Sequence, residues 1–93
     1  MKGREMRIVA ESGVHTTIFD DGALLAVSRN GKVFRANPTA AAMWTAIAES
    51  DGDPERAAVS IANHYGIPQE RARSDLTSLV GRLHDAQLIR WQP

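Results

Sequence analysis

Hydrophobic and polar residues alternate along the first third of the chain. The segments 14–19 (VHTTIF), 23–28 (ALLAVS) and 32–36 (KVFRA) are short and rich in β-branched and aromatic side chains, which is typical of strands. They are separated by DDG at 20–22 and by RNG at 29–31, and the glycine that ends each link tolerates the positive φ of a tight turn. The pattern therefore predicts three antiparallel strands joined by two hairpins.

The period of the pattern then changes from two residues to about 3.6, the period of a helix. Asn37-Pro38 and Asp53-Pro54 each place a capping side chain before a proline, and proline fits the first turn of a helix. We therefore expect one helix from Pro38 to SDGD at 50–53, a second over about 54–65 and a third over about 69–86. The predicted fold class is α+β, with a three-stranded antiparallel sheet followed by three helices.

The two ends of the chain carry weaker signals. Residues 1–12 lack a regular pattern, which leaves open that they are flexible, and LIRWQP at 88–93 is interpreted as a short extended tail. Trp91 in this tail is open to three interpretations: an exposed residue, a cover for the sheet, or a contact with a partner. The length of 93 residues predicts a single domain over residues 1–93.

Composition narrows the class of protein. Eleven basic and eleven acidic side chains give a net charge of zero, which counts against a dedicated nucleic-acid binder. The chain has no cysteine, so disulfides and thiolate chemistry are impossible. No stretch approaches the roughly 18 apolar residues of a membrane span, and the first residues lack the apolar block of a signal peptide. These features predict a cytoplasmic protein.

Candidate catalytic and metal-binding residues do not converge. His15, His64 and His84 belong to three different predicted elements, and no two have the i, i+4 spacing of a helical metal-binding pair. The carboxylates of residues 49–55 suit a loop and a helix N-terminus, and their spacing does not match a calcium loop. No phosphate-binding glycine loop and no G-x-S-x-G motif occurs. The sequence therefore predicts a protein that is not an enzyme and has no metal or other cofactor.

The third predicted helix carries a wide apolar stripe. Its residues are Leu76, Leu79, Val80 and Leu83. One interpretation places all four in the core. In the other, part of the stripe is the floor of a groove beside the sheet with charged residues at its rim, which suits a peptide ligand.

Two segments of the chain resemble the PqqD-like family, also called RiPP recognition elements. They are ANPTAAAMWTAI, starting at Ala36, and IANHYGIPQERARSDLTSLVGRLHDAQLI, starting at Ile61. The family pattern matches Asn37-Pro38-Thr39 to Trp44, Ala62 to Tyr65, and Asp75-Leu76 through Leu79, Leu83 and Leu88-Ile89. The resemblance covers about residues 14–90, although ESDGDPE at 49–55 is longer and more acidic than the usual family loop.

This resemblance implies a winged helix-turn-helix-like fold and a function. Such domains bind the leader segment of a ribosomally made precursor peptide, which adds to the edge of the third strand and packs on the third helix. The chain is similar to the stand-alone leader-binding component of lasso-peptide biosynthesis in bacteria, a monomer whose partners are a leader peptidase and a cyclase. The implied peptide-binding residues are Lys32, Val33, Phe34, Arg35, Ala36, Ala72, Arg73, Asp75, Leu76, Leu79 and Leu83.

The implied function agrees with the physics of an edge strand, whose unpaired amide and carbonyl groups can bind a peptide of any sequence. Other functions stay open. A PqqD-type protein would act as a peptide chaperone in pyrroloquinoline quinone synthesis. A winged-helix DNA-binding protein would use Arg71, Arg73 and Arg82 of the third helix, against the zero net charge and the apolar stripe. The edge strand could also serve dimerisation.

Overall fold

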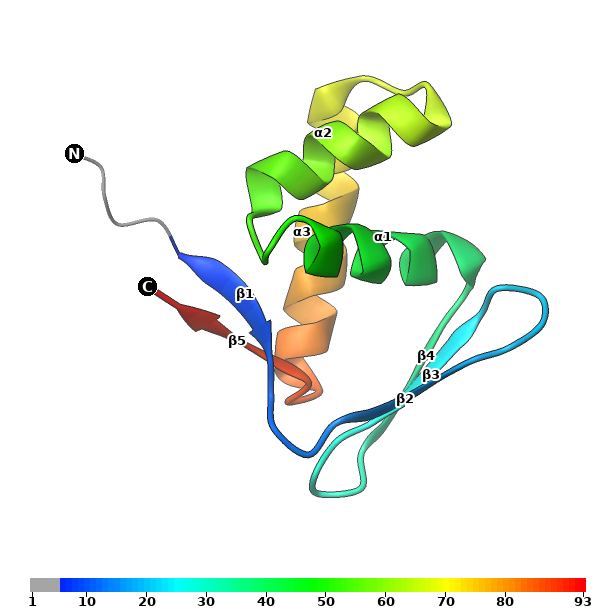
Figure 1. Ribbon diagram of the computed structural model, residues 1–93, viewed down its shortest axis with the longest axis vertical. Coiled ribbons are helices and arrows are strands. Elements are labelled where there is room, and N and C mark those ends of the chain that lie inside the picture. Colours follow the sequence, from blue (N-terminus) through cyan, green and yellow to red (C-terminus); the bar gives the residue numbers. More distant parts are fainter. Residues whose placement is uncertain (1–5) are drawn as a thin grey trace.

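The structure, a computed structural model, describes residues 6–93 as two small sheets and three helices (Figure 1). The strands are β1 (Arg7–Ala10), β2 (His15–Ile18), β3 (Leu24–Val27), β4 (Val33–Ala36) and β5 (Ile89–Gln92). The helices are α1 (Pro38–Glu49), α2 (Pro54–Tyr65) and α3 (Gln69–Asp85). In the view of Figure 1, the β1–β5 pair and the sheet β2-β3-β4 lie on opposite sides of the lower part of α3. The predicted α+β fold class is confirmed.

Both predicted hairpins form and give an antiparallel sheet in the order β2-β3-β4. Each turn ends in a glycine with positive φ, 93° at Gly22 and 86° at Gly31. In the second hairpin the Ser28 N–H donates to the Lys32 carbonyl at 2.8 Å, which closes a three-residue loop. A positive φ at the last residue of such a loop is strongly unfavourable for most side chains, so the two glycines fix the turns.

The helices begin where the capping signals predict. The Asn37 carboxamide oxygen accepts the Ala40 N–H at 2.8 Å, and the Asp53 carboxylate accepts the Glu55 N–H at 3.0 Å. In both helices the next residue is a proline, whose missing N–H is no loss in the first turn. Gly66 ends α2 in the left-handed conformation with φ of 66°.

The ends of the described chain form a second sheet, which the pattern of the sequence does not predict. β1 pairs antiparallel with β5, with Arg7 opposite Gln92 and Ala10 opposite Ile89. The expectation of a flexible start over residues 1–12 is therefore corrected for residues 7–10, whereas residues 1–5 lie outside the described residues. The predicted order of three strands and three helices gains one strand before it and one after it.

The acidic loop between α1 and α2 packs against β1. The Ile8 N–H donates to the Gly52 carbonyl at 2.8 Å, and Arg7 Nη1 donates to the Asp51 carbonyl at 3.3 Å. Gly52 has φ of 79°, and a Cβ atom there would overlap the Ile8 backbone. The unusual length of this loop is thus matched by an extra strand, which the loop holds in place.

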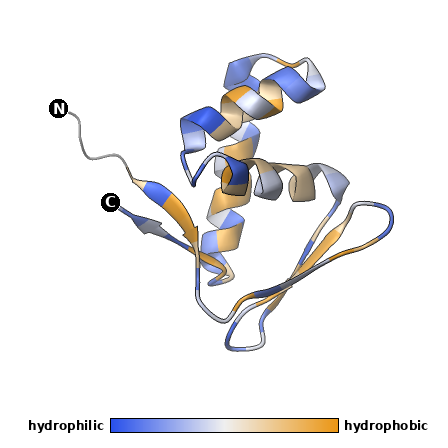
Figure 2. Cartoon of the chain, viewed as in Figure 1, coloured by the Kyte–Doolittle hydropathy of each residue, from blue (hydrophilic) through white to orange (hydrophobic). Residues whose placement is uncertain are grey.

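A single core lies between the helices and the two sheets, and apolar segments of the strands and of α3 face it (Figure 2). Its largest fully buried side chains are Leu24, Leu79, Leu83 and Leu88. The core thus takes side chains from β3, from α3 and from the connection to β5, so α3 is the central element. No helix among the described residues is both long and apolar enough to cross a membrane.

Candidate functional site

β4 is an edge strand whose outward backbone groups can be assigned from the hydrogen-bond pattern. The Ser28 N–H bonds to the Lys32 carbonyl, so these two residues form a hydrogen-bonded pair. Because such pairs alternate in an antiparallel sheet, the N–H and C=O groups of Phe34 and Ala36 also bond to β3. The N–H and C=O groups of Val33 and Arg35 therefore point away from the sheet. We call these four outward groups the β4 edge.

β2 is the opposite edge strand of the same sheet and follows the same rule. The Phe19 N–H donates to the Ala23 carbonyl at 2.8 Å, which makes this a hydrogen-bonded pair. The alternation then directs the backbone groups of Thr16 and Ile18 away from the sheet. Among the described residues no further strand pairs with β2 or β4, so the sheet has two edges, and their surroundings decide which is the better peptide site.

The side chains of β4 divide between two faces. Phe34 lies opposite the buried Ala26 and is half-buried, and Ala36 is buried, so both face the helices. Val33, which is 61% exposed, and Arg35 lie on the outer face. A strand added at the β4 edge would place its alternate side chains beside one face or the other.

α3 approaches the helix-facing side of β4. The Arg82 guanidinium carbon lies 6.0 Å from the centre of the Phe34 ring, a distance at which an arginine is attracted to an aromatic face. The Asn30 carboxamide, in the β3–β4 turn, donates to Gln87 Oε1 just after α3 at 3.0 Å. These contacts hold β4 beside α3 and leave its edge open.

The apolar α3 residues predicted to line a peptide groove lie in the core. Ala72 and Leu83 are 0% exposed, Leu79 is 1% exposed and Leu76 is 2% exposed. They do not form the floor of an open groove in this structure, and their contact with a peptide stays a prediction. The interpretation that places the whole apolar stripe in the core is the one that the structure supports.

The charged α3 residues predicted for the site lie on different faces of the helix. Arg73 binds the Glu55 carboxylate of α2 through two hydrogen bonds of 3.1 and 3.0 Å. These bonds, followed by the attraction of the same negative charge, raise the pKa of Arg73. It precedes Arg82 by about two and a half turns and therefore faces away from β4.

Asp75 lies on the same face of α3 as Arg82, because about two turns separate them. Its carboxylate lies 3.9 Å from Arg71 Nε, one turn before it. Arg82 itself is absent from the predicted set of peptide-binding residues. The signal in the sequence that points to Arg82 is its spacing of seven residues from Asp75, which places it on the same helix face as a residue of the predicted set.

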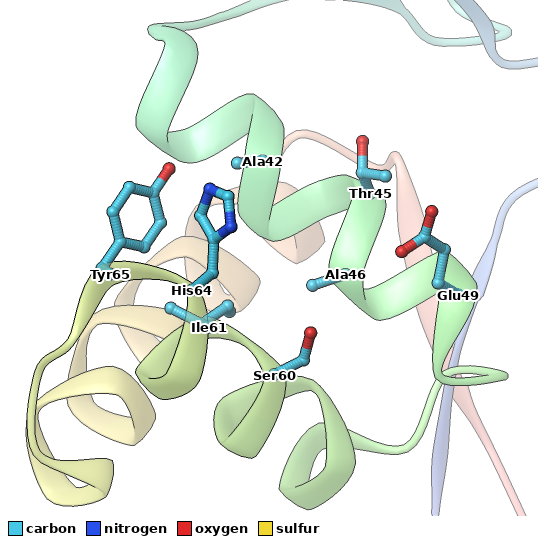
Figure 3. A pocket seen from close by; sticks show the side chains of 8 residues that line it. All are labelled: Ala42, Thr45, Ala46, Glu49, Ser60, Ile61, His64 and Tyr65. Atoms are coloured by element: carbon cyan, nitrogen blue, oxygen red, sulfur yellow. The ribbon is translucent and has the colours of Figure 1, made fainter.

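An open pocket of about 260 Å³ lies between α1 and α2 (Figure 3). The ring of His64 packs edge-on against Tyr65 at one end, with centroids 4.7 Å apart, while Glu49 lies at the other end. The Thr45 hydroxyl donates to the Ala41 carbonyl of its own helix at 3.1 Å. His64 and Glu49 thus lie at opposite ends of the pocket rather than side by side. Among the described residues there is no cluster of three or more potential metal ligands.

Three comparisons place the chain among known proteins. The family model described as coenzyme PQQ synthesis protein D (PqqD) matches residues 21–89. No curated protein matches the chain. A solved structure described as TbiB1 in complex with the TbiA(beta) leader peptide is similar in fold, with a TM-score of 0.78 and 18% sequence identity over 88% of this chain and 94% of that one. The family match spans β3 to α3 and most of the chain, and so this protein belongs to the PqqD family.

Proposed function

We propose that this protein binds the leader segment of a ribosomally synthesised precursor peptide, and that it is a binding protein rather than an enzyme. Membership of the PqqD family supports this proposal, as does the likeness in fold to TbiB1, which was solved with a leader peptide. The observation that carries it is the β4 edge, where the backbone groups of Val33 and Arg35 are free beside α3.

The leader would bind as a fourth strand of the sheet. Val33 and Arg35 each offer one donor and one acceptor, and each added hydrogen bond contributes about 0.5–1.5 kcal/mol. This backbone contribution is independent of the peptide sequence, whereas pockets for alternate side chains provide selectivity. On the helix-facing side the leader would contact Phe34 and Arg82, and on the outer side it would contact Val33 and Arg35.

The β4 edge suits this task better than the β2 edge. Of the four exposed β2 residues only Ile18, at 58% exposed, is a large apolar side chain, whereas β4 offers both Val33 and the half-buried Phe34. β4 continues directly into α1 and lies beside Arg82 of α3, so a peptide on its edge would contact a helix as well as a strand.

We propose that the bound leader is delivered to a leader peptidase, and to a cyclase in a lasso-peptide pathway of the bacterial cytoplasm, by a protein that is monomeric on its own. A second candidate is the handling of a precursor peptide for pyrroloquinoline quinone, which the description of the family model favours. Both candidates use the same edge and differ only in the peptide and the enzymes.

The test measures, by fluorescence polarisation, binding of a fluorescent synthetic leader from a short precursor peptide, for which the genes beside that of this protein are searched. Arg35→Pro removes an outward N–H and should weaken binding about tenfold relative to Arg35→Ala, which loses only the side chain. Thr16→Pro makes the matched change at the β2 edge and should bind like the unchanged protein. Circular dichroism establishes that each variant is folded.

Two results would contradict this mode of binding. Equal affinities of the folded Arg35→Pro and Arg35→Ala variants would exclude pairing at the β4 edge. A loss with Thr16→Pro alone would move the peptide to β2.

A further inference from the structure

Three cationic side chains surround the β4 edge and indicate the chemistry of its ligand. We propose that the peptide strand that pairs with β4 carries acidic side chains, which Lys32, Arg35 and Arg82 bind. This inference rests on the proposed function, because it concerns the same edge and names the class of peptide that it selects.

Six Lys and Arg residues of the described chain form no ion pair, and what distinguishes three of them, Lys32, Arg35 and Arg82, is their position around the β4 edge. The ion pairs of the described residues join Arg71 to Asp75, Arg73 to Glu55 and Arg90 to Glu11. Within the same part of the chain, Lys32, Arg35 and Arg82 form no ion pair. The protein as a whole is neutral, so unpaired positive charge next to a free backbone edge is a local property.

The three cations lie on both sides of the position that an added strand would occupy. Lys32 is two residues before Phe34, so their side chains lie on the same, helix-facing side of the sheet. On this side the Arg82 guanidinium lies over the Phe34 ring. Arg35 lies on the outer side. Since successive side chains of a strand alternate between faces, acidic residues at both even and odd positions of the peptide would meet a cation.

The Phe34 ring adds an apolar contact beside these charges. Phe34 is half-buried, so part of its surface is open to a ligand side chain. The ring also supports the Arg82 guanidinium at 6.0 Å, which limits the freedom of that side chain before a ligand binds. The expected peptide therefore has acidic residues next to an apolar one.

Among the described residues, no carboxylate near this surface forms an ion pair with any of the three cations. Asp75 shares the face of α3 with Arg82 and is paired with Arg71. Asp85 is one turn after Arg82 and forms no ion pair among the described residues. In the sheet, Asp21 lies in the β2–β3 turn, where its carboxylate accepts the Ala23 N–H at 2.9 Å. β4 itself carries no carboxylate.

The first experiment uses a displayed library of random 15-residue peptides, which requires no known ligand. We expect binders of the unchanged protein to be enriched in Asp and Glu relative to the library. A variant with Lys32→Glu, Arg35→Glu and Arg82→Glu together should instead select peptides rich in Lys and Arg. If the binders of the unchanged protein lack acidic enrichment, the inference is overturned.

The second experiment titrates one synthetic acidic peptide from that selection against single variants. Arg35→Glu and Arg82→Glu should each weaken binding about threefold to tenfold, since an exposed attraction is replaced by a repulsion. Arg56→Glu is the matched control, because Arg56 is an exposed arginine on α2 beside Ser60 and Asn63, and it should leave binding unchanged. Equal losses in all three variants would show a general charge effect and overturn the assignment.

The two proposals fail in different ways. Uncharged binders that are still lost with Arg35→Pro but not with Arg35→Ala would refute the acidic preference and leave strand addition in place. Acidic binders that tolerate Arg35→Pro as well as Arg35→Ala would keep the charge preference and refute pairing with the β4 edge.

Discussion

At the scale of the residue, Gly52 determines how closely the α1–α2 loop can approach β1. Its carbonyl accepts the Ile8 N–H at 2.8 Å, and its φ of 79° is one that side chains rarely adopt. A Cβ atom at this position would meet backbone atoms of Ile8, which cannot move as a flexible side chain can. The loop and the strand are therefore in contact only because the side chain is absent.

We predict that Gly52→Ala lowers the free energy of unfolding by roughly 3 kcal/mol, the sum of an unfavourable φ and a steric overlap. Gly31→Ala is the control, because Gly31 has a similar φ of 86° and no atom within 4 Å of the added Cβ. It should lower the free energy by only about 1–2 kcal/mol. Urea unfolding of both variants measures the difference, and equal losses would show that the contact with Ile8 is not tight.

At the scale of the element, the backbone groups of successive β4 residues point alternately toward β3 and away from the sheet. This alternation separates residues that hold the sheet together from residues available to a partner. Phe34 and Ala36 exchange hydrogen bonds with β3, whereas Val33 and Arg35 direct theirs outward. A proline at Phe34 would therefore damage the sheet itself, whereas a proline at Arg35 changes only its edge.

Amide hydrogen exchange, resolved by residue, should show this alternation. In the free protein the Phe34 and Ala36 amides should exchange slowly and those of Val33 and Arg35 quickly. Addition of the leader should slow exchange at Val33 and Arg35 alone in this strand, because only their N–H groups gain a partner. Increased protection at Thr16 and Ile18 instead would place the peptide on β2.

Local signals in the sequence predict local structure well. The turns at Gly22 and Gly31 and the caps at Asn37 and Asp53 each depend on a few neighbouring residues, and the structure has all of them. The β1–β5 sheet depends on two four-residue strands about 80 positions apart, and neither carries a strong signal by itself.

The same limit explains what the sequence could and could not indicate about the site. The composition of residues 32–36 predicts the strand β4. Which of its amides face outward, however, depends on its pairing with β3. The α3 stripe showed which side chains are apolar, but not that other elements cover Leu76, Leu79 and Leu83. Arg82 acquires its place in the site from the Phe34 ring, which is distant in the sequence.

At the scale of the whole molecule, the zero net charge counts against DNA binding. Backbone hydrogen bonds and apolar contacts respond little to salt, and three exposed cations add only a moderate dependence. We predict that raising the salt from 50 to 200 mM weakens leader binding less than about tenfold. Binding of an unrelated DNA duplex, measured in the same titration, should be weak throughout. A fall of about 10³ with tight duplex binding would favour the DNA-binding alternative.

The pairing of β1 with β5 also has a consequence for the order of folding. Its pairs join residues that are far apart in the sequence, from Ala10 with Ile89 to Arg7 with Gln92, whereas the hairpins and helices involve near neighbours. Closing so long a loop loses more conformational entropy than closing a hairpin does. We therefore expect β1 and β5 to join late, after the local elements have formed. During synthesis on the ribosome β1 emerges first and β5 last. The first described strand must therefore wait for nearly all of the remaining chain before its partner exists.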